Sequence, residues 1–410
     1  MVDPKNADAI LYQTVWDRMD PDDTDLPLVL DYPPRMAWLS LTTQCNLTCT
    51  HCVRYTNKLL NIEKPDIEMS DPLFEQIKKE LMPGLEGCIL GGNNFGEQLI
   101  SKKFLQFSSL TGQSDTLTEI ITNGTALTRE RAQYIVDNDI QVRLSLEGAT
   151  EQTYTMTRGA RFSKLYEQLK YYSQLLKDNP KSKSQLIFNF VMFAGGARDL
   201  PKVIELAAEL GFLGVTVILF YPRNEFQRFQ SMLYHRSLFE EVYRESQALA
   251  EKHQVILNMP KPLAMGRMEA TLDPSETQQS ETAPQKLYCG LPWSAISIDA
   301  DGKVYPCCSS KVMGNLNDNS LMEIWNNKEY QKLRKGILTG RKMAMICKGC
   351  QWARWGKETV MTETAIMRSI GLFDSIPAME LSKLLVLKLL SKLPGQAKIK
   401  QILKAIHSRI

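Results

Sequence analysis

The chain has 410 residues, of which 43% are hydrophobic and 23% charged, as is ordinary for a globular protein with one large domain and a smaller one. Its formal net charge is +3, but residues 381–410 hold six Lys and one Arg without an acid, so the rest of the chain carries −4. With that charge, the rest of the chain is not expected to bind nucleic acid. There is neither an uncharged apolar stretch of the about 18 residues that a membrane span needs nor a secretory signal pattern, so we expect a cytoplasmic protein. It has nine cysteines, and those that are clustered are expected to bind metal rather than to form disulfides.

The first part of the chain alternates between strand and helix patterns. Residues 1–35 are rich in Asp and Pro and are expected to be an irregular or partly helical lead-in. Short apolar runs then predict strands at Ala37–Leu41, Gly87–Leu90, Leu117–Thr122, Gln141–Leu146, Ser184–Phe193 and Val215–Phe220. Helices are predicted at Asp71–Glu80, Thr128–Asn138, Ser163–Leu176 and Asp199–Leu210. This alternation predicts an α/β fold, a (β/α)6 partial TIM barrel over residues 36–258.

Three further segments are expected after the barrel. Residues 259–286 are rich in Pro, Ser, Thr, Gln and Glu and read as a linker. Residues 287–356 are expected to form a small auxiliary domain around a β-hairpin over Ile296–Tyr305. Residues 357–410 end in a basic helical tail, in which Leu and Ile recur at helical spacing beside Lys.

Three cysteines in the spacing C-x3-C-x2-C follow the first predicted strand, at Cys45, Cys49 and Cys52. Active sites of β/α barrels form on such loops. Three thiolates would leave one iron of a [4Fe–4S] cluster open, whereas clusters that only transfer electrons usually have four cysteine ligands. The alternative is a zinc site, but zinc usually takes four ligands, and His51 lies inside the C-x2-C pair, where it is poorly placed to be the fourth.

A second set of cysteines surrounds the predicted hairpin. Cys289 and Cys307 stand near its two ends, and Cys347 and Cys350 form a C-x2-C pair farther along the chain. Four thiolates can close a tetrahedral site, and on spacing alone zinc is as plausible as a second [4Fe–4S] cluster. Cys308 is the odd thiol beside this set.

These motifs resemble those of the radical S-adenosylmethionine (SAM) enzymes. The resemblance implies that SAM chelates the open iron and is reductively cleaved to a 5′-deoxyadenosyl radical, with electrons from a donor such as flavodoxin or ferredoxin. The second cysteine set, with Gly302 inside it, is similar to the auxiliary-cluster domain called SPASM, in its shortened Twitch form. It therefore implies a second [4Fe–4S] cluster rather than zinc.

The same resemblance assigns residues that contact SAM. Gly96 and Glu97 match the end of the family's second motif, and Ser145 matches a residue that contacts the SAM carboxylate or ribose. The family pattern also implies SAM contacts, or support for them, at Asn123, Arg158 and Asn189. For Arg158 the expected ligand is a carboxylate, which suits a guanidinium fork. Cys308 is a candidate hydrogen donor to a substrate radical, with simple packing as the alternative.

The reaction type is left open by the residues. The Twitch resemblance to an inosamine dehydrogenase favours a small sugar or aminocyclitol substrate that is oxidised or epimerised, since the lead-in is short for a peptide-recognition domain. The alternatives are modification of a ribosomal peptide or protein, and a non-catalytic iron–sulfur redox or scaffold protein. The tail over residues 381–410 is expected to contact an anionic membrane surface, the open barrel of its own chain, or a partner protein.

Overall fold

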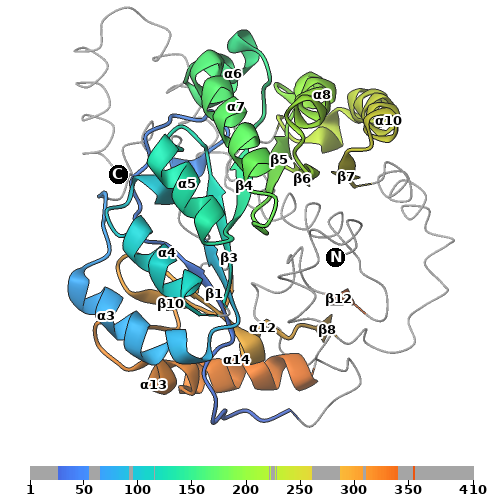
Figure 1. Ribbon diagram of the computed structural model, residues 1–410. Helices are drawn as coiled ribbons and strands as arrows, with labels where there is room; N and C mark the ends of the chain where they lie inside the picture. Colours follow the sequence, from blue (N-terminus) through green and yellow to red (C-terminus); the bar gives the residue numbers. More distant parts are fainter. Residues whose placement is uncertain are drawn as a thin grey trace, which may run out of the picture.

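The computed structural model describes residues 26–54, 65–91, 96–114, 116–220, 222, 227, 229–260, 287–307, 311–339 and 354–355 (Figure 1). Cys308, Cys347 and Cys350, the expected tail, nearly all of the expected linker and most of the lead-in lie outside these residues. Within the described part of the chain, no helix is long and apolar enough to cross a membrane.

One ten-stranded sheet organises the structure, in the order β11-β10-β9-β1-β2-β3-β4-β5-β6-β7. All neighbours from β9 through β1 to β7 run parallel, and β10 and β11 are antiparallel additions at one edge. Its strands are β1 (Met36–Leu39), β2 (Gly87–Leu90), β3 (Leu117–Thr122), β4 (Gln141–Ser145), β5 (Leu186–Met192), β6 (Gly214–Leu219), β7 (Ile256–Asn258), β9 (Ala295–Ile298), β10 (Lys303–Tyr305) and β11 (Gly314–Asn315). A separate pair is formed by β8 (Leu287–Tyr288) and β12 (Arg354–Trp355).

Helices cover one face of this curved sheet (Figure 1). Those that connect parallel strands are α3 (Asp71–Glu80), α4 (Phe104–Gly112), α5 (Arg129–Asp137), α6 (Glu151–Arg158), α7 (Phe162–Asp178), α8 (Leu200–Leu210) and α10 (Arg236–His253). Three more, α12 (Leu291–Ser294), α13 (Leu321–Trp325) and α14 (Lys328–Thr339), accompany the hairpin strands. Short 3-10 turns occur at Met82–Gly84, Gln98–Ile100, Ala197–Asp199 and Met232–Tyr234.

The sequence patterns account for these elements in physical terms. The strand β2 reads Gly-Cys-Ile-Leu and is buried along its whole length, as expected of a parallel strand covered on both faces. The hydroxyls of Ser70, Thr128 and Thr150 accept hydrogen bonds at the amino ends of α3, α5 and α6. Gly211 closes α8 in the left-handed conformation, as its position after the last apolar residue predicts.

The expected partial barrel is confirmed, and the structure extends it. All six predicted strands are present, and β7 adds a seventh parallel strand beside β6. The hairpin β9–β10 joins the same sheet, because β9 pairs with β1 with Ile296 opposite Ala37. The segment that carries Cys289 and Cys307 is therefore continuous with the sheet that carries the first cysteine loop.

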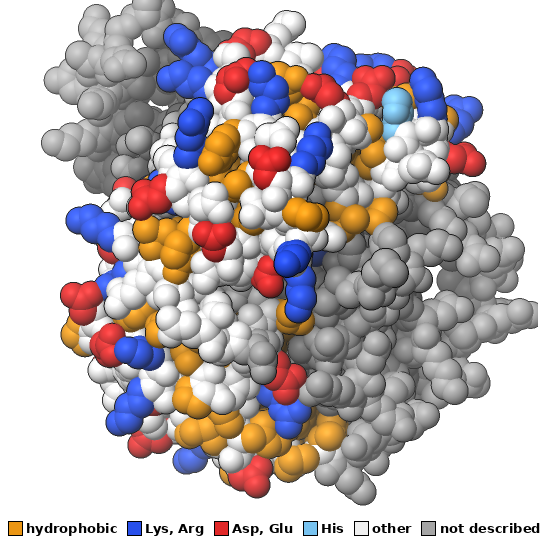
Figure 2. Space-filling model, in the orientation of Figure 1, with side chains coloured by type: hydrophobic (Ala, Val, Ile, Leu, Met, Phe, Trp, Pro, Cys, Tyr) orange, Lys and Arg blue, Asp and Glu red, His pale blue; other side chains and the backbone are white. Residues whose placement is uncertain are grey.

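The described surface carries mixed charge. In Figure 2, Lys and Arg side chains alternate with Asp and Glu over the described part of the face shown, and no broad area has one sign. Exposed ion pairs of the described residues include Arg198–Glu241 and Lys170–Glu167. The described part of this face lacks the basic stripe that is typical of nucleic-acid binding.

Candidate active site

The cysteine loop leaves the sheet after β1, and the side chain of Gln98 holds its beginning. Gln98 Oε1 accepts hydrogen bonds from the backbone N–H groups of Leu41 (2.7 Å) and Thr42 (3.3 Å), and its Nε2 donates to the Thr42 carbonyl (3.2 Å). Gly96 packs against the same backbone, since a Cβ atom there would lie 2.2 Å from the Thr42 carbonyl oxygen. The segment after β2 therefore fixes where the cysteine loop starts.

The carboxylate of Glu97 ties the ends of β2 and β3 together. Glu97 is 2% exposed, and it accepts hydrogen bonds from the Thr122 hydroxyl (2.6 Å) and from the N–H groups of Asn123 (2.7 Å) and Leu99 (3.2 Å). Burial raises the pKa of this carboxyl, and the three donors oppose the rise. Its backbone N–H donates to the Gln44 carbonyl (2.7 Å), one residue before the first cysteine. The Glu97 carboxylate thus makes its hydrogen bonds to groups of the protein itself.

Asn123 places an amide beside the first cysteine. Its Nδ2 donates to Asn46 Oδ1 (3.0 Å) and approaches Cys45 Sγ at 3.9 Å. Its Oδ1 accepts from the Thr125 N–H (2.9 Å), which holds the amide in this orientation. The Asn-Gly turn after β3 therefore faces the cysteine loop.

Arg158, the last residue of α6, lies between Glu147 and Cys49. Its Nη1 donates to Cys49 Sγ (3.5 Å), and its Nη2 forms an ion pair with Glu147 Oε2. Arg158 is only 5% exposed and Glu147 is completely buried. Burial disfavours the charged guanidinium, but the charges of Glu147 and Cys49 hold the pKa of Arg158 above its ordinary value. The Arg158 guanidinium is therefore charged inside the protein, with the Glu147 carboxyl as its ion-pair partner.

The carboxyl end of α6 also contacts the loop through its backbone. The Thr157 carbonyl accepts a hydrogen bond from the Thr50 N–H (3.0 Å). Gly159 closes the helix with φ +72°, and a Cβ atom there would lie 2.5 Å from Thr48 Oγ1. Residues 157–159 thus hold the middle of the loop at the two residues that flank Cys49.

His51 is partly buried between the second and third cysteines of the loop. Its ring packs on Phe193 with centroids 5.1 Å apart, and its Nε2 lies 3.7 Å from Glu147 Oε2. Burial lowers the pKa of His51 to about 4 although Glu147 acts in the opposite direction, so the ring is neutral at pH 7. Gln227 Nε2 donates to the His51 carbonyl (3.2 Å), which links the segment after β6 to the loop.

Ser145 and Asn189 meet at the ends of two neighbouring strands, since they are opposite each other in the β4–β5 register. Asn189 is 7% exposed, and within the described residues its Oδ1 has no hydrogen-bond partner. A buried acceptor without a donor is costly, and a bound hydroxyl group would satisfy it. This pair therefore fits a ligand with hydroxyl groups, as the ribose of SAM has.

The chemistry of the three thiols suits an iron–sulfur cluster, whose cysteine ligands are thiolates. Burial raises the pKa of Cys45 to about 11 and also raises the pKa of Cys49, so both thiols need a metal to become thiolates at neutral pH. Among the described residues, no three His, Cys, Asp or Glu side chains converge on one point as ligands of a single metal ion. A [4Fe–4S] cluster does not need such convergence, because each thiolate binds a different iron.

The described part of the second cysteine set lies beside β1. Cys289 follows β8 and Cys307 follows β10, and both are partly buried against one small apolar cluster that includes Met36 and Leu291. The β9–β10 hairpin lies between them in the chain, as the spacing predicts.

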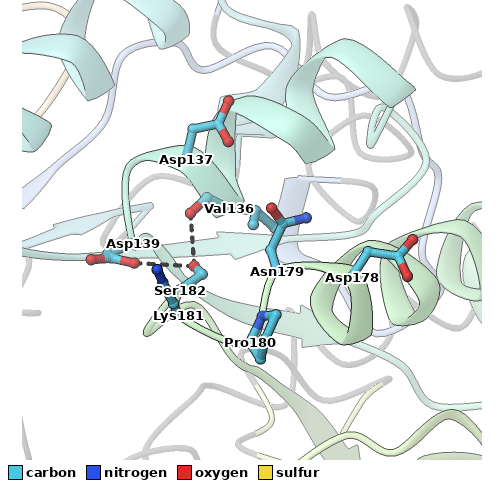
Figure 3. A pocket seen from close by; sticks show the side chains of 8 residues that line it. All are labelled: Val136, Asp137, Asp139, Asp178, Asn179, Pro180, Lys181 and Ser182. Carbon is cyan, nitrogen blue, oxygen red and sulfur yellow. Dashed lines mark hydrogen bonds between the residues drawn. The ribbon is translucent and has the colours of Figure 1, made fainter.

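A hollow of about 440 Å³ lies elsewhere in the structure (Figure 3). It is formed where α5 leads into β4 and where α7 leads toward β5, and Ser182 Oγ donates there to Val136 O (2.7 Å) and Asp139 Oδ1 (3.0 Å). These turns precede their strands, so the hollow is at the amino ends of the parallel strands. The cysteine loop follows its strand, and barrel active sites form at that end. The hollow is therefore not part of the candidate site.

Sequence reasoning missed two residues that organise the site. Gln98 stands where the family often has Pro, and its role depends on backbone contacts with residues 57 and 56 positions earlier in the chain. The partnership of Glu147 with Arg158 joins the end of one strand to the end of a helix that was not predicted. The only available signal for Glu147 was an acidic residue directly after a buried strand.

Two family models match the chain. The radical SAM superfamily model covers residues 39–188, and the SPASM iron–sulfur cluster-binding domain covers residues 289–351. The first range contains the cysteine loop and the strand ends that surround it. The second contains the described Cys289 and Cys307.

Curated relatives are similar over most of the chain. The antilisterial bacteriocin subtilosin biosynthesis protein AlbA of Bacillus subtilis is 22% identical over 309 residues, which are 73% of this chain and only 61% of AlbA. The cysteine-type anaerobic sulfatase-maturating enzyme of Clostridium perfringens is 22% identical over 334 residues, which are 75% of this chain and 83% of that enzyme.

The fold is shared with a solved structure described as native anSMEcpe with bound AdoMet and Kp18Cys peptide. The TM-score is 0.52 at 19% identity, and the match covers 83% of this chain and 96% of that one. This likeness concerns the fold, and the family follows from the two domain models together with the cysteine spacing. The chain belongs to the radical SAM superfamily, with a carboxyl-terminal SPASM domain, and its cofactors are [4Fe–4S] clusters and SAM.

Proposed function

We propose that this radical SAM enzyme is a maturase that modifies a ribosomal peptide or a protein. The proposal rests mainly on the two curated relatives described above, whose names refer to bacteriocin biosynthesis and to sulfatase maturation. They favour this alternative over the sugar or aminocyclitol substrate that the short lead-in and the Twitch-like spacing suggested. A non-catalytic scaffold is disfavoured by the three-cysteine loop, because a relay does not need an open iron.

Cys45, Cys49 and Cys52 are proposed to hold the cluster that binds SAM. When bound, the two cofactors together supply reductive cleavage of SAM and a radical that abstracts hydrogen from the substrate. The protein's own contribution is to hold the loop in place from three sides, through Gln98, Asn123 and the end of α6. Because these contacts come from different β/α units, the loop is positioned before any cofactor arrives.

Ser145 and Asn189 are proposed to hold the nucleoside of SAM, with the backbone at Gly96 and Glu97 next to its amino acid part. The buried and unpartnered Oδ1 of Asn189 supports this, because a ribose hydroxyl would complete its hydrogen bonding. Phe193 has ring contacts with His51 (centroids 5.1 Å apart) and with Phe220 (6.0 Å), and it offers an apolar surface at the same strand ends. These side chains would orient SAM and exclude water from it.

Cys289, Cys307, Cys347 and Cys350 are proposed to hold the auxiliary cluster, with an external reductant such as flavodoxin or ferredoxin supplying electrons. Cys308 remains a candidate hydrogen donor, because it directly follows a proposed ligand. In a net two-electron oxidation, an auxiliary cluster would accept the electron that a substrate radical gives up.

Two substrate probes test the proposal under anaerobic conditions. The reconstituted protein is incubated with SAM, dithionite and either a synthetic Cys-containing peptide or a deuterated aminocyclitol. We expect 5′-deoxyadenosine and a mass change in the peptide, and no label from the aminocyclitol. Deuterium transfer from the aminocyclitol to 5′-deoxyadenosine, with the peptide unchanged, would overturn the peptide assignment in favour of the small-molecule one.

A further inference from the structure

A buried ion pair between Glu147 and Arg158 stands beside the proposed cluster loop. Glu147 is completely buried and Arg158 is 5% exposed, so water hydrates neither to any extent. A buried ion pair is weak support for stability, because desolvation offsets most of its attraction. The position of this pair next to Cys49 therefore suggests a functional role.

The arginine is fixed from both sides. Glu147 accepts a hydrogen bond from the Val191 N–H through Oε1 (3.2 Å), which anchors its carboxylate to β5. Its Oε2 pairs with Arg158 Nη2, and Arg158 Nη1 then points at Cys49 Sγ. The helix end that carries Arg158 is itself held on the cysteine loop through Thr157 and Thr50.

This geometry occupies one donor on each terminal nitrogen of Arg158. Its Nη2 pairs with Glu147 and its Nη1 donates to Cys49 Sγ. A guanidinium has five N–H donors, and the buried Nε–H of Arg158 has no hydrogen-bond partner within the described residues. The contact with Cys49 is therefore compatible with a further ligand at Nε, such as the carboxylate that the family resemblance implies.

A cation and an N–H donor at a cluster sulfur have a known physical effect. Reduction adds negative charge to an iron–sulfur cluster, and hydrogen bonds to its sulfurs and nearby positive charge favour the reduced state. Arg158 supplies both at Cys49, whereas Asn123 offers Cys45 only a neutral amide at 3.9 Å. Glu147 limits the effect of the arginine, because its charge is opposite.

We propose that Arg158 is a positioning residue for the cluster held by Cys45, Cys49 and Cys52, and that Glu147 orients it. Arg158 donates to the Cys49 thiolate and raises the reduction potential of the cluster, which eases the electron transfer that precedes SAM cleavage. The inference rests on the proposed cluster assignment.

The test is the midpoint potential of this cluster in the SAM-free, reconstituted full-length protein, followed by electron paramagnetic resonance during a redox titration. A variant with Cys45, Cys49 and Cys52 replaced by Ala gives the signal of the auxiliary cluster alone, which is subtracted. Iron content is measured for every variant. If the triple variant keeps its full iron content, the cluster assignment fails, and that failure is distinct from failure of the Arg158 proposal.

Three single variants then separate the roles. Arg158→Met should make reduction at least about tenfold less favourable, which is about 59 mV for one electron. Glu147→Gln should shift the potential in the opposite direction, because it removes the negative partner and keeps the cation. Arg158→Lys should lie between the wild type and Arg158→Met. If Arg158→Met does not retain iron, the test rests on the other two variants. The midpoint potential of Glu147→Gln should then lie above that of the wild type, and the midpoint potential of Arg158→Lys below it.

Two results would overturn the proposal. An unchanged SAM-free potential in Arg158→Met, together with weaker SAM binding, would assign Arg158 to the SAM carboxylate. Shifts of the same sign in Glu147→Gln and Arg158→Met would show that either change merely loosens the loop. The neutral variant Asn123→Ala serves as a control and should shift the potential less than Arg158→Met does.

Discussion

Replacing Arg334 should destabilise the fold strongly, because this buried side chain joins three separate segments. Its Nε donates to the Pro292 carbonyl (2.8 Å), and its Nη1 donates to the Leu28 carbonyl (2.7 Å) and to Asn326 Oδ1 (3.3 Å). Trp325 and Tyr330 pack on its guanidinium, with ring centroids 4.6 and 5.2 Å from Cζ. The arginine thereby ties the start of the described chain to α12 and α14.

The cost of Arg334→Met follows from these contacts. Two backbone carbonyls would be left without their donor, at about 1–3 kcal/mol each. Two cation–π contacts would be lost, at about 0.5–2 kcal/mol each. Part of this loss is offset, because the substitution also removes a buried charge. Burial disfavours that charge and lowers the pKa of Arg334 to about 10. Methionine fills much of the same volume, so we expect a net loss of roughly 3–5 kcal/mol.

Urea unfolding followed by pulse proteolysis measures this loss. Lys332→Met is the matched control, because Lys332 lies on the exposed side of the same helix. Its effect should stay within about 0.5 kcal/mol. If Arg334→Met changed the free energy of unfolding by no more than the control, the three-segment role of Arg334 would be refuted.

Three further predictions concern the loop and the tail. Gly159→Ala should lower stability and iron content more than Gly211→Ala. Both glycines have positive φ, which an alanine adopts at a cost of about 1–2 kcal/mol, but only at Gly159 would the new Cβ meet a close atom, Thr48 Oγ1 at 2.5 Å. Equal losses of stability in urea unfolding would contradict this. Gln98→Leu leaves the backbone hydrogen-bonding groups of Leu41 and Thr42 without their partner, so it should lower the free energy of unfolding by about 2–4 kcal/mol and reduce iron retention. A variant that keeps its full iron content and unchanged stability would count against the role of Gln98 in holding the loop. Removing residues 381–410 should abolish flotation with anionic liposomes, and equal recovery of both forms would reject membrane docking by the tail.

The sequence was sufficient to predict the parts of the fold that depend on local pattern. The strand β2 is a short apolar run and α3 has Ser70 and Pro72 at its start, so both are readable from neighbouring residues. The helix α6 was missed, because its residues Glu151–Arg158 include three Thr and no regular apolar face. The pairing of β9 with β1 was also missed, since nothing within either strand specifies a partner some 260 residues away.

The candidate site shows the same division between local and long-range information. The spacing of Cys45, Cys49 and Cys52 is a local signal and predicted the chemistry of the family. The family resemblance predicts a carboxylate ligand for Arg158, and the structure adds an ion pair with Glu147 that the sequence does not reveal. Which anion a buried arginine meets is decided by how strands and helices are brought together, and single-sequence patterns do not contain that information.

The central claim is that Cys45, Cys49 and Cys52 hold the cluster at which SAM is cleaved. It is tested most directly by measuring iron content and 5′-deoxyadenosine in the reconstituted wild type and in the variant with all three cysteines replaced by Ala. The wild type should hold about eight irons and form 5′-deoxyadenosine, and the variant should hold about four irons and form none. A variant that kept all of its iron, or that still cleaved SAM, would contradict the account.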